Sequence, residues 1–433
     1  MTALLATGAS PGSPPPGPAR LDHLDATRAF ALVLGVVFHA SLSFMPVFIG
    51  WAVQDVSTGP LVAQFVTVSH SFRMPVFFLL AGCFSHLAFH RRGAWEFGRS
   101  RVLRIVVPFV IGWFLLRPLL VSGWVMGFAS MRGDYDVRAG LTAGLATLQA
   151  LPAGLFTQTH LWFLYYLVLI TALTLAGRAL LGAVAGRRAG RWARGVDAGV
   201  AWLARSPWGL PVFAAPTALV LWRMDIWGMD TPDRSLQPHL PVLLIYGGFF
   251  CFGWLLGRQP AAMAGLARLT PVRWIGAATG LAGVLLLGGI QLDPGHPHHA
   301  AAHRVFVAGY ALMMWSLVFL AIGVFQKFCA RPRPWVRYVA DSSYWMYLIH
   351  LPIVVWLQVA VAEVPVHWAF KLPFISAVTI AVTLLSYDLF VRSTLLGAIL
   401  NGRRRDRVLL PWVGARTSSD NERASPEPNE ATS

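Results

Sequence analysis

The sequence predicts an all-α integral membrane protein with about ten transmembrane helices and both termini in the cytoplasm. Of its 433 residues, 56% are hydrophobic and only 12% are charged, and the mean hydropathy is +0.58. A soluble domain carries roughly 25% charged residues. Long apolar runs recur along the whole chain, and basic residues gather in alternate loops between them.

Ten apolar segments are each predicted to cross about 30 Å of hydrocarbon, which takes about 20 helical residues. They cover residues 26–48, 61–89, 105–129, 159–178, 207–226, 239–258, 271–291, 304–326, 338–361 and 370–400.

The loops between these segments differ in charge. Arginines gather in loops 90–104 and 179–206, whereas loop 49–60 contains no Lys or Arg. Because Lys and Arg collect on the cytoplasmic side, both termini are predicted to lie inside the cell. The net charge of +16 then describes one membrane face, which attracts anionic lipid and phosphorylated ligands rather than nucleic acid.

The composition divides the chain into three parts. Residues 1–19 are rich in Pro, Gly and Ala and are predicted to form a disordered cytoplasmic leader. Residues 20–402 form the transmembrane domain, and 403–433 a basic and then disordered cytoplasmic tail. The three cysteines are scattered and predict neither a disulfide framework nor a zinc site. The four histidines of the outer loop QLDPGHPHHAAAHR lack zinc spacing, so we expect no metal there.

The first apolar segment carries two strongly polar residues, Arg28 and His39. An ionisable residue inside a membrane span is costly, so it indicates a functional site. Eleven residues make about three helical turns, so the two side chains share a face and lie roughly 16 Å apart. Asp25 can meet Arg28 on that face. The structural alternative is a helix cap with a snorkelling Arg28, and a core role for His39.

The second and third segments add further cations. His70 and Arg73 stand about one turn apart in HSFRMPVFFLLAG, and a guanidinium at that depth needs a carboxylate, carbonyls, water or an anionic ligand. Pairing of Arg73 with a buried acid such as Asp388 is the structural alternative. Arg101 and Arg104 form an R-x-x-R pair before the third segment, and paired guanidiniums suit phosphate binding.

Three later spans carry polar residues as well. His160 opens the fourth span in THLWFLYYL and is followed by Trp162, which indicates either an aromatic belt or a platform for a sugar. His350 lies within YWMYLIHLPIVV, where core packing and a site role are both open. Asp388 and Arg392, four residues apart, predict an ion pair inside the membrane.

These motifs resemble the acyltransferase 3 family. LDATRAFALVLGVVFH is similar to its first-helix signature, approximately LDGLRxxAxxxVxxxH, and differs from it in LDATR. HSFRMPVFFLLAGCFSHL and THLWFLYYLVLI are similar to the members that succinylate osmoregulated periplasmic glucans, although AGCF stands where SGYF or SGFF is usual. The resemblance covers about residues 20–400.

The resemblance implies an O-acyltransferase of the bacterial inner membrane. Such an enzyme moves an acyl group, succinyl or acetyl, from cytosolic acyl-CoA to a hydroxyl of a periplasmic glucan or another extracytoplasmic carbohydrate. It implies His39 as the essential catalytic histidine, Arg73 in the core, and Arg28, Arg101 and Arg104 on the acyl-donor side.

The residue chemistry agrees with this reading. The arm of CoA is comparable in length to three helical turns, so the phosphorylated head could lie among the arginines with the thioester near His39. His39 would act as a general base and Arg73 would stabilise the oxyanion, with a transient acyl-His39 as the variant mechanism. Asp25, His70, His160, Trp162 and His350 would support the site. Acyl-CoA is then a co-substrate, and no resident cofactor is expected.

A non-enzymatic transporter or flippase of a sugar or a lipid-linked substrate is the alternative, because buried His, Arg and Asp also serve as relays in carriers. A carrier should show inverted repeats with matched broken helices, and the sequence shows none by eye. The sequence leaves room for a homo-oligomer.

Overall fold

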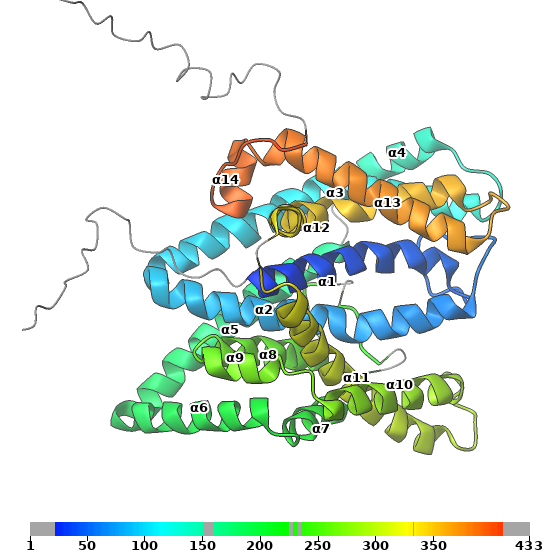
Figure 1. The fold of residues 1–433 in the computed structure, drawn as a ribbon. Coiled ribbons are helices and arrows are strands. Elements are labelled where there is room, and N and C mark those ends of the chain that lie inside the picture. Colours follow the sequence, from blue (N-terminus) through cyan, green and yellow to red (C-terminus); the bar gives the residue numbers. More distant parts are fainter. Residues whose placement is uncertain (1–21, 150–158, 225–227, 233–234, 332, 410–433) are drawn as a thin grey trace, which may run out of the picture.

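The computed structural model describes residues 22–149, 159–224, 228–232, 235–331 and 333–409. Within these ranges the protein consists of helices and contains no strand, which confirms the predicted all-α class (Figure 1). The predicted leader 1–19 and the tail beyond residue 409 lie outside the described residues.

Fourteen α-helices and five short helical turns make up the described chain. The α-helices are α1 (Asp22–Ser41), α2 (Pro60–Arg101), α3 (Val107–Ser130), α4 (Val137–Ala146), α5 (Trp162–Ala185), α6 (Ala189–Arg205), α7 (Gly209–Leu221), α8 (Leu240–Leu256), α9 (Pro260–Leu266), α10 (Pro271–Gln291), α11 (His299–Phe328), α12 (Pro334–Val361), α13 (Trp368–Ser386) and α14 (Leu395–Asn401). The turns are the 3-10 helices η1 (Leu42–Phe44), η3 (Thr159–Leu161) and η4 (Gly186–Arg188) and the π-helices η2 (Val102–Val106) and η5 (Tyr387–Val391).

Seven helical stretches in the described chain are long and apolar enough to cross a membrane. One of them, Pro60–Ser130, contains both α2 and α3, which Figure 1 shows running in opposite directions. Each of the ten predicted segments coincides with an α-helix, but α7 has 13 residues and α8 has 17. The protein is therefore an integral membrane protein, and the number of crossings stays a prediction.

The reversal between α2 and α3 begins at Gly93. This residue has φ +79°, a conformation that favours glycine because it has no Cβ. The helix continues through Pro75, and Gly93 holds the non-helical dihedral angles within α2. The bend carries Arg101 and Arg104 to the wall of the cavity that Arg28 also lines.

Close helix contacts hold the centre of the bundle. Helix α1 packs against α2, α11, α12 and α13, and α2 packs along α8. A Cβ at Gly82 would overlap the carbonyl oxygen of Phe250, and one at Gly253 would overlap that of Leu79. Small residues allow such close approach of membrane helices. Gly82 and Gly253 thus let α2 and α8 pack closely.

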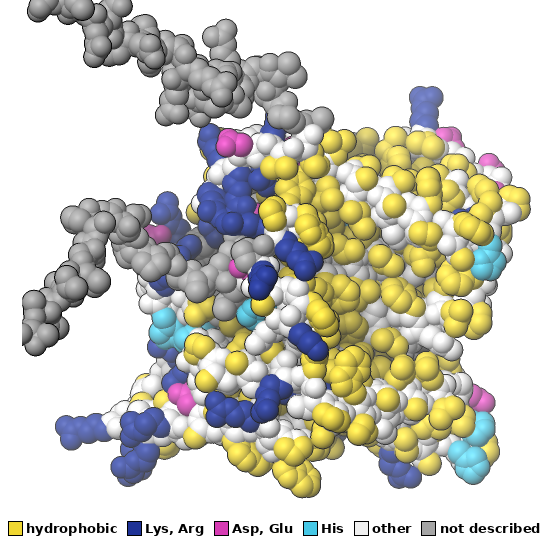
Figure 2. Space-filling model, in the orientation of Figure 1, with side chains coloured by type: hydrophobic (Ala, Val, Ile, Leu, Met, Phe, Trp, Pro, Cys, Tyr) yellow, Lys and Arg dark blue, Asp and Glu magenta, His cyan; other side chains and the backbone are white. Residues whose placement is uncertain are grey.

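The molecular surface is divided by residue type. Figure 2 shows Lys and Arg side chains gathered on the left, where α2 turns into α3 and where α14 lies, and a broad hydrophobic surface beside them. Such a division fits a helical bundle whose middle faces lipid and whose basic end faces water.

Candidate active site

All ten residues that the sequence assigns to the site line one cavity with a volume of about 560 Å³. They are Asp25, Arg28, His39, His70, Arg73, Arg101, Arg104, His160, Trp162 and His350. The cavity has an arginine-rich end and a histidine-rich end. Arg28 and His39 mark these two ends on the same helix, roughly 16 Å apart by helical rise.

Three histidines from different parts of the chain meet at one end. The ring centroids of His39 and His350 are 5.2 Å apart, and those of His160 and His350 are 5.4 Å apart. His350 Nδ1 lies 2.8 Å from the carbonyl oxygen of Tyr347. His160 Nε2 lies 2.9 Å from the carbonyl oxygen of Leu348. Because a carbonyl oxygen only accepts, these ring nitrogens carry the hydrogens, and the rings are held in fixed orientations.

The imidazole of His39 is held differently. Its Nδ1 is buried and has no hydrogen-bond partner among the described residues. The ring stacks on Trp51 with centroids 5.7 Å apart, and the backbone oxygen of His39 accepts from Gln358 Nε2 at 2.9 Å. Packing therefore fixes the position of His39, while a ring nitrogen stays available to exchange a proton with a ligand.

Arg73 is a buried cation beside this histidine cluster. Its side chain is 7% exposed, its Nε is buried without a partner, and no carboxylate in the described chain lies within ion-pair distance of it. Its guanidinium lies 4.3 Å from the ring centroid of Phe38. The proposed structural pairing of Arg73 with Asp388 is wrong, because Asp388 binds the backbone of residues 408 and 409 instead. A buried guanidinium without a carboxylate suits an anionic ligand or a developing negative charge.

His70 and Trp162 shape the wall around Arg73. The ring of His70 stacks on Phe38 with centroids 5.5 Å apart, and its Nε2 lies 3.3 Å from Thr231 Oγ1. Trp162 stacks on Tyr246 at 5.7 Å. Both residues are thus held by neighbours in the wall, which fits the supporting roles expected of them.

The arginine-rich end begins in the first two turns of α1, which carry Asp25 and Arg28. Arg28 Nη2 donates to the carbonyl oxygen of Ala340 at 2.9 Å and lies 3.3 Å from Asp25 Oδ1, which confirms the predicted contact between Asp25 and Arg28. Arg101 lies over the ring of Phe97 at 4.6 Å. The backbone oxygen of Arg104 accepts from Tyr344 Oη at 2.5 Å. The R-x-x-R pair and Arg28 therefore face the same cavity from three helical segments.

Sequence reasoning missed several residues at this end. The cavity is also lined by Arg92, Asp341, Tyr344, Asn401, Arg403 and Arg405. The sequence predicts only a basic cytoplasmic tail after α14, and the position of its arginines in the cavity depends on packing that leaves no local pattern. In the described chain, no group of three or more His, Cys, Asp or Glu side chains could hold a metal ion.

Comparison with known proteins identifies the family of this chain. The family described as "Acyltransferase domain" matches residues 21–388, a range that includes all ten of the cavity residues predicted from the sequence. The chain belongs to the acyltransferase 3 family. It is therefore an acyltransferase by family, as its motifs predicted, and its helices make it a membrane member.

Several curated proteins that are similar to this chain carry a common name. "Glucans biosynthesis protein C" of Escherichia coli K12 is 31% identical over 159 residues, which are 36% of this chain and 39% of the relative. The proteins of the same name from strains SMS-3-5 and O1:K1 match with the same identity and coverage. The chain thus covers about two fifths of the length of these relatives. No solved structure matches it significantly.

Proposed function

We propose that this acyltransferase 3 protein moves a succinyl or acetyl group from cytosolic acyl-CoA to a hydroxyl of a periplasmic glucan or another extracytoplasmic carbohydrate. The observation that carries the proposal is the single cavity that joins arginines at one end to His39 and Arg73 at the other. The name of the E. coli relatives supports a glucan as the acceptor.

The arginine-rich end supplies the binding site for the donor head. Guanidinium groups bind phosphates through paired, charge-assisted hydrogen bonds. Arg28, Arg101 and Arg104 lie where the head of acyl-CoA would enter, and the arm would run along α1. The roughly 16 Å between Arg28 and His39 matches about three helical turns, which is comparable to the length of that arm.

The histidine-rich end supplies the proton transfer. His39 takes the proton of the acceptor hydroxyl as its oxygen attacks the thioester carbonyl carbon. Arg73 stabilises the negative charge that develops on the carbonyl oxygen. The carbon–sulfur bond then breaks, the ester forms, and the CoA sulfur leaves with the proton from His39. A transient acyl-His39 that the acceptor hydroxyl attacks is the variant of this mechanism.

The proposal places the protein in the bacterial inner membrane with its arginine-rich end in the cytoplasm. This orientation follows the positive-inside principle and gives the donor head access from the cytosol. The acceptor then approaches the histidine cluster from the opposite side.

The test uses the purified full-length protein in lipid nanodiscs with radiolabelled succinyl-CoA or acetyl-CoA and isolated periplasmic glucans. We expect release of CoA thiol and formation of labelled, base-labile ester on the glucan in equal amounts. Movement of glucan or of a lipid-linked sugar across proteoliposomes without ester formation would support the transporter alternative and contradict this proposal.

A further inference from the structure

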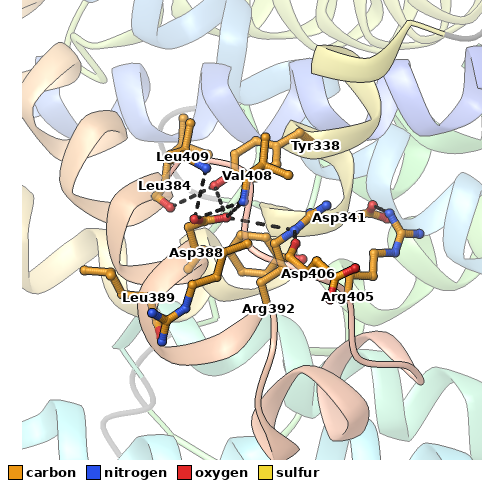
Figure 3. Close-up of polar contacts among 12 residues, drawn as sticks. Tyr338, Asp341, Leu384, Asp388, Leu389, Arg392, Arg405, Asp406, Val408 and Leu409 are labelled. Atoms are coloured by element: carbon orange, nitrogen blue, oxygen red, sulfur yellow. Dashed lines mark hydrogen bonds and ion pairs between the residues drawn. The ribbon is translucent and has the colours of Figure 1, made fainter. Parts of the chain in front are cut away.

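Residues 402–409 follow α14, and this segment folds back onto η5 and α12 (Figure 3). Its anchor is Asp388, whose side chain is 0% exposed. Asp388 Oδ1 accepts from the backbone nitrogen of Val408 at 3.0 Å, and Oδ2 accepts from that of Leu409 at 3.0 Å. Hydrogen bonds to an ionised carboxylate are stronger than neutral ones. The buried charge therefore fixes the far end of this segment.

The predicted ion pair of Asp388 with Arg392 is present at 3.9 Å, but Arg392 also has a second role. Its Nε donates to the backbone oxygen of Asp406 at 2.5 Å, and its own backbone oxygen accepts from the nitrogen of Arg405 at 2.9 Å. Arg407 Nη2 donates to the carbonyl oxygen of Leu389 at 3.0 Å. The segment is thus held at several points along its length, as Figure 3 shows.

This anchoring brings Arg403 and Arg405 to the cavity wall. Arg405 forms an ion pair with Asp341 of α12, which also lines the cavity. Gly402 has φ +79°, and a Cβ there would overlap the guanidinium of Arg104. Glycine at this turn therefore lets the segment lie directly against the R-x-x-R pair.

The charges around the arginine-rich end do not balance. Apart from Arg73 at the histidine-rich end, six arginines and two aspartates line the cavity, and they are Arg28, Arg92, Arg101, Arg104, Arg403, Arg405, Asp25 and Asp341. Asp25 contacts Arg28 and Asp341 contacts Arg405, whereas the other four arginines have no carboxylate within ion-pair distance in the described chain. Such an excess suits a ligand with several negative charges.

We propose that residues 402–409 form one wall of the acyl-donor site. In this wall, Arg403 binds a phosphate of the acyl-CoA head. Asp388 is a positioning residue that holds this wall in place. The inference rests on the proposed function, and it extends the donor site from the helices to the segment after the last helix.

The test compares two neighbouring arginines of the intact protein. Both side chains are exposed, but Arg403→Ala removes an arginine that lines the cavity, whereas Arg404→Ala removes the same charge from a position that does not line it. We expect Arg403→Ala to weaken binding of CoA about tenfold or more, as for loss of a hydrogen bond to a charged group. Arg404→Ala should change the Kd less than about twofold, because its side chain does not line the cavity and acts on the ligand only as a screened surface charge. The Kd is measured by titration calorimetry in nanodiscs.

Asp388→Asn tests the anchor. The amide keeps the size of the side chain but turns an N–H toward the backbone N–H of residue 408 or 409, so the segment should be released. We expect a raised KM for acyl-CoA with kcat retained, and faster tryptic cleavage after the arginines of this segment, Arg403, Arg404, Arg405 and Arg407. A purely structural role would lower the amount of active protein and leave the KM unchanged.

The outcomes separate this inference from the proposed function. Wild-type protein that binds no CoA would overturn both. Wild-type binding that Arg403→Ala and Arg404→Ala reduce equally would overturn the inference alone. Unchanged KM in Asp388→Asn, with the segment cleaved faster, would also overturn it.

Discussion

Arg73 of α2 lies against Gly35 of α1 so closely that a Cβ at residue 35 would be 2.8 Å from Arg73 Nη1. Gly35 stands four residues before His39 on the same helix, and both line the cavity. The missing side chain at residue 35 therefore gives the guanidinium its place beside the histidine cluster.

If Arg73 stabilises the oxyanion, Arg73→Ala should lower kcat about 10²–10³-fold with little change in the donor KM, because the interaction forms only in the transition state. Gly35→Val should lower kcat by a smaller factor, since it displaces the guanidinium of Arg73 without removing it. Steady-state kinetics with purified variants measure both effects.

Gly247→Val is the matched control for this pair, because a Cβ at Gly247 of α8 would meet no atom within 4 Å. It should keep wild-type kinetics. A donor KM that rises in Arg73→Ala while kcat stays constant would assign Arg73 to donor binding instead.

The R-x-x-R pair should act on donor binding. Arg101→Ala and Arg104→Ala should each raise the KM for acyl-CoA about tenfold and leave kcat nearly unchanged, because contacts to a remote phosphate stabilise ground and transition states alike. Arg99→Ala is the control: its side chain is 64% exposed and pairs with Glu96 outside the cavity. Equal KM values for acyl-CoA in all three variants would contradict a role of Arg101 and Arg104 in donor binding.

The orientation of the bundle gives a further prediction. Reporter fusions after residue 97 and at the C-terminus should both report a cytoplasmic location, since the arginines gather at that end of the molecule (Figure 2). A periplasmic signal from either fusion would contradict the ten-span topology and the cytosolic entry of the donor.

A buried ion pair joins the loop after α1 to α13. Lys371 Nζ lies 2.7 Å from Asp55 Oδ1, and the two side chains are 4% and 2% exposed. Lys371→Met leaves a buried carboxylate unpaired and should cost about 3–5 kcal/mol of stability, while Asp55→Asn with Lys371→Met should cost less. Thermal unfolding of the purified variants measures this. Lys327→Met, at the other lysine of the chain, which is exposed, should leave the unfolding temperature unchanged. An equal drop in the unfolding temperature of both lysine variants would show that the ion pair does not contribute to stability.

The sequence best predicted which residues of a single helix lie near one another. Helical periodicity alone relates Arg28 to His39 and Asp25 to Arg28, and the structure places these residues on one cavity. Arg101 and Arg104 were also predictable, because their spacing is local.

Contacts between residues that are far apart in the sequence were not predictable in the same way. Asp388 was paired with Arg392 because they stand one turn apart, but its oxygens also bind backbone nitrogens of residues 408 and 409. Backbone groups are present at every residue, so they leave no signal in the sequence. The pair of Asp55 with Lys371 and the place of Arg403 likewise depend on how remote segments pack.

The central claim is that His39 transfers a proton. Gln fills a similar volume and can hydrogen-bond, but it cannot accept a proton near neutral pH. His39→Gln should therefore remain folded and inserted, whereas its transfer rate should fall about 10²–10⁴-fold. His298→Gln, at an exposed position of the outer loop, is the control and should keep wild-type activity.

The decisive measurement is acyl transfer from labelled acyl-CoA to glucan by purified, monodisperse His39→Gln beside wild type and His298→Gln. Loss of transfer in His39→Gln alone, with CoA binding retained, is the result that the mechanism predicts. Transfer by His39→Gln at a near-wild-type rate would contradict it and remove His39 from the chemistry.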